Sequence, residues 1–144
     1  MPLFRRNKPS QPVFDGPPED PRWVKSPTTG KYTRLLRLDP EKLGLRDVSG
    51  VVVIWHAGVK PRWVYVSHTD DLAEHLHQIG NNQEIMRYET NGGLYVTWSL
   101  IREEYQEGVV KFLTAQMKPL IANPYIAASD ADPVPVLTPT QTQV

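Results

Sequence analysis

The spacing of apolar residues predicts three strands in the middle of the chain. Residues 51–55 form a continuous apolar run, which is typical of a strand buried on both faces. Residues 63–67 follow after a short loop that contains Gly58 and Pro61, so an antiparallel hairpin is expected. Residues 94–100 alternate between apolar and polar, which predicts a third strand with its apolar even-numbered positions on one face.

Two segments have the apolar spacing of amphipathic helices. In residues 70–79 the apolar positions share one face, and either Thr69 or Asp70 can cap the first turn. Residues 103–118 carry a longer apolar stripe, and Pro119 cannot continue a helix. Both segments are therefore predicted to be helical.

Two shorter signals precede these elements. Residues 31–38 predict a short strand, although their apolar and polar side chains do not separate onto opposite faces. Residues 39–43 predict one helical turn, because a proline follows a capping aspartate. The main elements run in the order ββαβα. We therefore predict an α+β fold in which a three-stranded, mostly antiparallel sheet is flanked by helices.

Proline is concentrated at the two ends of the chain. Residues 1–27 contain seven prolines and few aliphatic residues, and residues 130–144 are rich in proline and threonine. Such segments bury too little apolar surface to offset the entropy lost on ordering. We predict a flexible, basic, proline-rich arm at residues 1–30, a folded domain at residues 31–126 and a disordered tail at residues 127–144.

Composition narrows the class of protein. The 144 residues carry no net formal charge and no cysteine, which excludes disulfides, thiolate metal sites and cysteine nucleophiles. The longest apolar stretch is far shorter than the roughly 20 residues of a membrane span. The basic N-terminus is not followed by the apolar segment of a secretory signal. We predict a cytoplasmic protein that spans no membrane and binds no cofactor.

The order and spacing of these segments resemble the GIY-YIG nuclease superfamily. Residues 49–53 (Ser-Gly-Val-Val-Val) lie where the first signature strand of that family lies, and residues 63–67 (Trp-Val-Tyr-Val-Ser) lie where the second does. Residues 69–72 then open a helix, and residues 112–123 resemble the closing helix with its Lys-Pro-Leu…Asn ending. The resemblance spans residues 49–124 and implies a GIY-YIG-like domain.

The resemblance also implies that this domain has lost its catalytic residues. In the family two tyrosines orient the nucleophilic water, an arginine neutralises the scissile phosphate and a glutamate binds a divalent metal ion. Tyr65 matches the second tyrosine, but Val52 replaces the first and His75 replaces the arginine. Val109, or Val110 with a one-residue slip, replaces the glutamate. We therefore expect no catalytic residue and no metal site at these positions.

The distribution of charge argues in the same direction. Residues 50–120 contain six Lys or Arg against eight Asp or Glu, whereas binding to nucleic acid depends on a positive surface. Residues 1–49 contain ten Lys or Arg against six Asp or Glu. This stretch is either a weak tether to nucleic acid or an acidic protein, or an ordinary solvated linker.

A few side chains are candidates for binding. Asp71 and His75 lie one helical turn apart and could chelate a metal ion, but the spacing forces no third ligand nearby, so a solvated polar face is the preferred interpretation. Tyr65 is interpreted as a packed strand residue. Trp63 is either part of the core or, if exposed, a contact site. The predicted binding residues are Phe4, Arg5, Arg6, Trp63, Tyr65 and His75.

These observations predict a non-catalytic protein-interaction or structural module whose terminal arms order on a partner protein. Residues 3–6 place apolar anchors beside two guanidinium groups, and residues 134–137 form a second apolar element between prolines. The alternatives are an accessory protein that binds nucleic acid without cleaving it, and a divergent GIY-YIG endonuclease with displaced catalytic residues. A basic groove beside Tyr65 and His75 would favour the alternatives, whereas an apolar patch would favour the interaction module.

Overall fold

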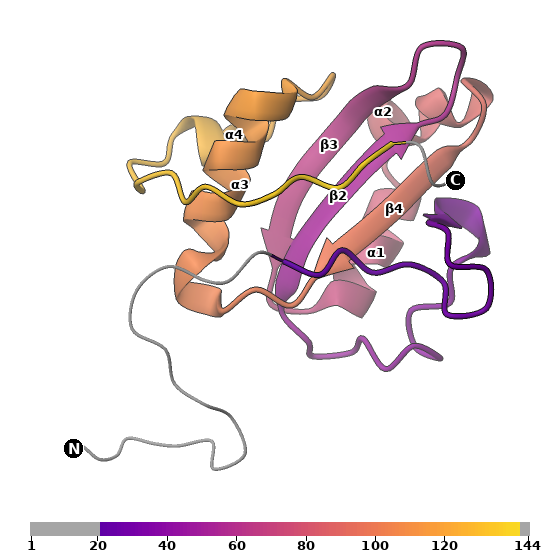
Figure 1. Cartoon of the computed structure of the whole chain (residues 1–144), viewed down its shortest axis with the longest axis horizontal. Coiled ribbons are helices and arrows are strands. Elements are labelled where there is room, and N and C mark those ends of the chain that lie inside the picture. The colour runs from indigo at the N-terminus through magenta and orange to yellow at the C-terminus, as the bar shows by residue number, and fades with distance from the viewer. Residues whose placement is uncertain (1–20, 142–144) are drawn as a thin grey trace.

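Strand β2 (Gly50–His56) is the central strand of the computed structural model, which describes residues 21–141. It pairs antiparallel with β3 (Arg62–Thr69) on one side and with β4 (Leu94–Ser99) on the other. All of its residues are buried, as the unbroken apolar run predicted. Helices accompany this antiparallel sheet, so the predicted α+β class is confirmed (Figure 1).

A fourth, very short strand extends the predicted three-stranded sheet. Strand β1 (Thr33–Arg34) pairs antiparallel with β4, which gives the order β1-β4-β2-β3. The chain then forms a 3-10 helix, η1 (Leu35–Arg37), which buries Leu35. The strand predicted over residues 31–38 is therefore wrong for most of its length, because Leu35 enters the core from a turn and not along a strand.

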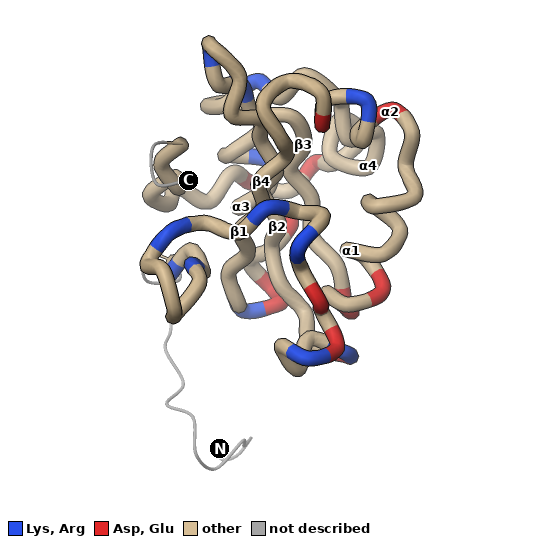
Figure 2. Tube along the Cα trace, turned by 90° about the vertical axis from the view of Figure 1, so that its right-hand side faces the viewer, with Lys and Arg blue, Asp and Glu red and all other residues tan. Residues whose placement is uncertain are grey.

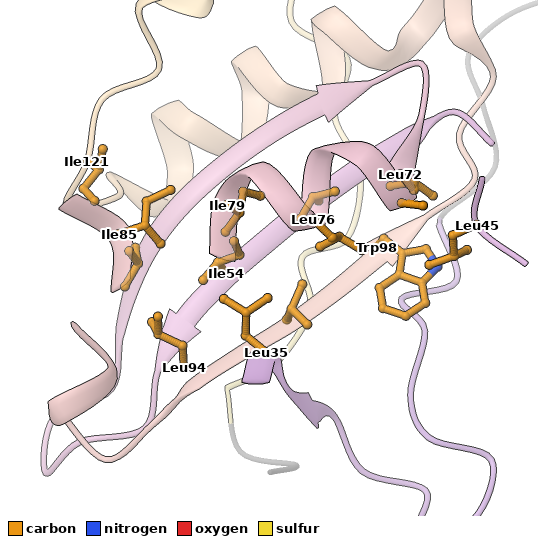
Figure 3. Packing of buried hydrophobic residues seen from close by; sticks show 14 residues of the cluster. Leu35, Leu45, Ile54, Leu72, Leu76, Ile79, Ile85, Leu94, Trp98 and Ile121 are labelled. Atoms are coloured by element: carbon orange, nitrogen blue, oxygen red, sulfur yellow. The ribbon is translucent and has the colours of Figure 1, made fainter. Parts of the chain in front are cut away.

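One face of the sheet is covered by α1 (Leu72–Gly80) and the short helix α2 (Gln83–Met86). Their apolar side chains meet those of the sheet in a cluster that we call the α1-side core (Figure 3). The even-numbered residues of β4 belong to it, as their alternation predicted, whereas Leu100 lies past the strand and is exposed. The buried members are Leu35, Leu45, Val52, Ile54, Val64, Leu72, Ala73, Leu76, Ile79, Ile85, Leu94, Val96, Trp98 and Ile121.

The opposite face is covered by α3 (Glu103–Met117) and the short helix α4 (Pro124–Ala127). The predicted helix and its end before Pro119 are confirmed, and Lys118 closes it in the left-handed conformation (φ 51°). The buried members of this α3-side core are Tyr32, Val51, Val53, Trp55, Val66, Ile101, Val109, Val110, Leu113, Ile126 and Val136. Within residues 21–141, no helix has the length and apolar character needed to cross a membrane.

Helix α1 begins at Leu72, two residues later than predicted. Its N-cap is Asp71, whose side chain accepts a hydrogen bond from the backbone N–H of Glu74 at 3.2 Å. Thr69, one of the two predicted caps, instead accepts a 3.1 Å hydrogen bond from the N–H of Asp71 through its hydroxyl. The predictions of Thr69 and of Asp70 as caps are both wrong, because the turn at Thr69 places the carboxylate of Asp71 over the free N–H groups at the start of the helix.

The sequence patterns missed the segment between α1 and β4. It contains α2 and a 3-10 helix, η2 (Arg87–Thr90). The Asn82 side chain caps α2 by accepting a 3.1 Å hydrogen bond from the N–H of Ile85, and Ile85 is buried. One turn of helix is too short to show a period of apolar residues. The helical turn predicted at residues 39–43 is present, with the N–H of Leu43 donating to the carbonyl of Asp39 at 3.2 Å.

Chain segments outside the four strands extend the hydrogen bonding at both sides of the sheet. The N–H of Val24 donates to the carbonyl of Trp98 at 3.0 Å, and the N–H of Ile121 donates to the carbonyl of Val64 at 3.0 Å. The predicted arm of residues 1–30 therefore includes at least one residue that is part of the folded domain. The C-terminal segment described below also packs on the folded domain.

Candidate functional site

The positions that the GIY-YIG resemblance assigns to catalysis do not meet in one place. Val52 is fully buried in the α1-side core, and Tyr65 packs against the same core from β3. His75 lies on α1, on that side of the sheet. Val109 is fully buried in the α3-side core, on the opposite face. The structure thus brings three of the four predicted positions to one face and places the fourth behind the sheet.

The His75 side chain connects helix α1 to strand β3 of the sheet. Its Nε2 lies 2.7 Å from the hydroxyl oxygen of Ser67 on β3, within hydrogen-bond distance. Burial lowers the pKa of His75, and His68 nearby lowers it further. The ring is therefore neutral near pH 7. A neutral ring bound to a serine joins α1 to β3 and offers no fixed positive charge to a phosphate.

Tyr65 and Trp63 on β3 are half-buried packing residues. Burial raises the pKa of Tyr65, with smaller effects of the same sign from Tyr125 and Glu84, so its hydroxyl remains protonated. The Trp63 ring meets the edge of Trp55 with the ring centres 5.6 Å apart. The other predicted binding residues, Phe4, Arg5 and Arg6, lie outside the described part of the chain.

The acidic and histidine side chains near α1 have other partners than a metal ion. The Asp71 carboxylate caps the helix, and the hydrogen bond that it accepts from the backbone N–H of Glu74 is the main cause of its lowered pKa. His77 contacts both carboxylate oxygens of Glu41 at 2.9 Å. Among residues 21–141, no three His, Asp or Glu side chains are grouped closely enough to hold a metal ion.

The C-terminal segment of residues 129–139, which we call the strap, packs on α3. The N–H of Val134 donates a 3.0 Å hydrogen bond to the carbonyl of Gly108, in the middle of that helix. Before it, Lys111 Nζ donates to the carbonyl of Ser129 at 2.8 Å, and the Ser129 hydroxyl donates to the carboxylate of Glu107. Figure 1 shows this segment, in yellow, running extended past α3 and across the sheet.

The far end of the strap meets the N-terminal part of the described chain. The indole Nε1 of Trp23 donates a 2.9 Å hydrogen bond to the carbonyl of Leu137. Val136 is buried in the α3-side core, and Val134 packs against that core. Leu137 is 65 % exposed, so alternate side chains of the strap face the domain, as in a bound extended peptide. The tail predicted to be disordered from residue 127 onward is therefore part of the folded domain as far as the strap reaches.

Gly108 shows that α3 is shaped to receive this segment. A Cβ atom at this position would lie 2.5 Å from the carbonyl oxygen of Asp132 and 2.7 Å from a methyl group of Val134. A glycine inside a helix costs about 1 kcal/mol relative to alanine. Here the missing side chain lets the strap backbone reach the helix backbone. We call the surface formed by these contacts the strap site. Its residues are Trp23, Glu107, Gly108 and Lys111, together with the aromatic residues Tyr32, Trp55 and Tyr95.

The aromatic residues of the strap site surround Trp55. Tyr32 meets its ring edge-on with the ring centres 4.9 Å apart, and Tyr95 stacks on it at 6.2 Å. Trp55 is completely buried, and its indole N–H has no hydrogen-bond partner in the described structure. Val136 joins the same cluster. Packing of a segment that contains prolines against aromatic side chains is a recurring mode of peptide recognition.

The sequence carries two signals for the strap site, of which the apolar element at residues 134–137 was assigned to a partner protein and Gly108 was not interpreted. Gly108 interrupts an otherwise good helix, which is a sign of close backbone approach. Val134, Val136 and Leu137 provide apolar side chains in an otherwise polar tail. The proline content of the tail predicts disorder, but the strap is docked on α3. An extended chain rich in proline loses less entropy when it docks, because its backbone is already restricted.

Comparison of the chain with protein-family models, with curated proteins and with solved structures finds no match.

Proposed function

We propose that the protein is a non-catalytic protein-interaction module, built on a degenerate GIY-YIG-like domain, whose strap site holds an extended segment containing prolines. The observation that carries this proposal is the contact of the strap with Gly108. A helix glycine placed under a peptide backbone, next to a cluster of aromatic rings, is a built receptor for an extended chain.

The residues at the presumed catalytic positions support the non-catalytic part of the proposal. Val52 and Val109 are core residues on opposite faces of the sheet, and His75 is neutral and bound to Ser67. Activation of a phosphodiester requires a permanent cation and a metal ligand close to one another. Neither requirement is met by these side chains.

The charge around α1 supports a protein ligand over a nucleic acid. Asp70 and Glu74 are exposed at the start of this helix, and Figure 2 shows acidic positions around it. Phosphate groups are repelled by such a surface. An accessory role in binding nucleic acid would instead have to use surfaces away from α1.

The test of the proposed function is binding of a peptide to an emptied strap site. Val136→Asp in the full chain should release the strap, since a carboxylate cannot remain among the aromatic residues. A labelled peptide of residues 130–141 should then bind this chain saturably, with a dissociation constant no weaker than about 1 mM, as expected for a short segment. The wild-type chain, whose site is filled, should bind more weakly.

Two controls keep this experiment decisive. The same peptide carrying Val136→Asp should not bind, and circular dichroism should show that the variant chain is folded. If the variant is unfolded, Val136→Ala gives a milder release with the same readout. Failure of the peptide to bind a folded, strap-released chain would refute the proposed role of this site.

A further inference from the structure

The N-terminal part of the chain contains a second segment with the pattern of the strap. Residues 134–137 of the strap read Val-Pro-Val-Leu, and residues 11–14 read Gln-Pro-Val-Phe. Both have a residue with a backbone N–H, then proline, then valine, then a large apolar residue. We infer that residues 11–14 of the same chain are an alternative ligand of the strap site and exchange with the strap.

The backbone donor, the buried valine and the exposed fourth residue of the strap each have a counterpart in residues 11–14, whereas Gln11 stands in place of the apolar Val134. The first residue of the pattern must donate its N–H to the Gly108 carbonyl, which Gln11 can do because it is not a proline. The third residue is the buried one, and Val13 is identical to Val136. The fourth residue is exposed in the strap, so the larger ring of Phe14 needs no additional cavity.

The linkers that join the two segments to the domain have similar lengths, so the two segments have similar effective concentrations at the strap site. Eight residues separate Phe14 from Trp23, which belongs to the strap site, and six separate Ala127 of α4 from Val134. Linkers this short give effective concentrations on the order of 1 mM for either segment. Neither segment therefore has a large advantage from its tether. When residues 11–14 occupy the site, the strap is released and its apolar residues become accessible to a partner.

This inference rests on the proposed function of the strap site, and one titration tests both. The labelled peptide of residues 130–141 is titrated onto the full chain with Val136→Asp and onto the full chain with Val13→Asp and Val136→Asp together. If residues 11–14 compete within the chain, their removal should tighten peptide binding by about tenfold, given an effective concentration near 1 mM and a segment dissociation constant of about 100 µM. Asn7→Asp with Val136→Asp is the matched control, because it places the same charge in the N-terminal region outside residues 3–6 and 11–14.

The possible results separate the two claims. Equal affinities of the single and double variants would overturn the inference and leave the proposed function intact, whereas no binding to either folded chain would overturn both. A gain that appears only as the chain concentration rises would assign the competing segment to a second copy, which overturns exchange within one chain. The Trp23 indole N–H signal in NMR gives a second measurement. The chemical shift of this proton should stay at its hydrogen-bonded value in the Val136→Asp chain and change only in the double variant. The same result is expected if the milder alanine substitutions have to be used.

Discussion

The backbone N–H of Val134 donates to the carbonyl of Gly108, so a backbone hydrogen bond fixes the C-terminal segment to the middle of helix α3. Such a contact needs a residue without a side chain at the point of approach. This makes the seating of the strap depend on one glycine, and it gives a substitution that tests the contact without touching the sheet.

Gly108→Ala should release the strap. The added Cβ would lie 2.5 Å from the Asp132 carbonyl oxygen, so the strap backbone has to move. Alanine improves the helix by about 1 kcal/mol, but loss of the burial of Val136 costs about 1.5–3 kcal/mol. We expect a net loss of stability on the order of 1 kcal/mol, together with faster hydrogen exchange of the Val134 amide.

Gly80→Ala is the matched control for this substitution. Gly80 is the last residue of α1, and no atom lies near the position of an added Cβ. The same chemical change should leave the exchange of the Val134 amide unaltered. Slow exchange of that amide in the Gly108→Ala chain would mean that the strap is not seated through Gly108.

A fragment of residues 30–126 should melt well below the full chain. It lacks Trp23 and Val24 on one side and the strap on the other, and so loses the burial of Val136 and the hydrogen bonds of Val24 and Val134. For a domain of about 100 residues, each 1 kcal/mol corresponds to roughly 4–8 °C of melting temperature. We expect a decrease of at least about 5 °C by calorimetry; equal midpoints would show that both flanking segments are dispensable.

The sequence predicted the sheet and its two main helices because these elements have regular patterns. The unbroken run of β2, the alternation of β4 and the stripe of α3 each arise from burial on defined faces. It did not predict where the ends of the chain lie. The docking of Val24 beside Trp98, and of Val136 among the aromatic residues, depends on contacts far apart in the sequence, and such contacts leave no local period.

The candidate site was predictable only in part for a related reason. A family pattern assigns roles along the chain, but the face that a residue occupies depends on the pairing of the strands. Val52 and Val109 have similar sequence signals, yet they lie on opposite faces of the sheet. Gly108 carried a signal in the sequence, but its meaning depends on the strap that covers it.

The stability of the protein should fall as the pH is lowered from about 7 to 5, and His75 should contribute to this fall. Burial lowers the pKa of folded His75 below the ordinary value of 6.5, so the unfolded chain takes up a proton more readily. The stabilisation is complete above the unfolded pKa and is lost as the pH falls through the folded pKa. The slope per group can reach about 1.4 kcal/mol per pH unit.

His75→Gln separates this contribution from others. Glutamine can still hydrogen bond to Ser67 but does not titrate, so the free energy of unfolding should decline less between about pH 7 and pH 5. A residual slope is expected because burial also lowers the pKa of His56. Urea titrations at several pH values measure both slopes, and a variant that declines as steeply as the wild type would remove His75 from this account.

The purified chain should leave DNA and RNA intact in the presence of Mg²⁺ or Mn²⁺. Val52 has no hydroxyl, His75 is neutral and bound to Ser67, and Val109 is buried behind the sheet. These positions therefore lack a permanent cation and a metal ligand, the two groups that stabilise charge on a phosphate during cleavage. The expected rate is that of a blank without protein. The informative comparison is with Tyr65→Phe, since Tyr65 is the one position of the GIY-YIG resemblance that carries a hydroxyl. Cleavage that needs the metal ion and disappears in the Tyr65→Phe chain would show that the hydroxyl acts in catalysis and would make the protein a nuclease with displaced residues. Cleavage that persists equally in both chains would show that the Tyr65 hydroxyl is not needed, because a phenylalanine cannot orient the attacking water.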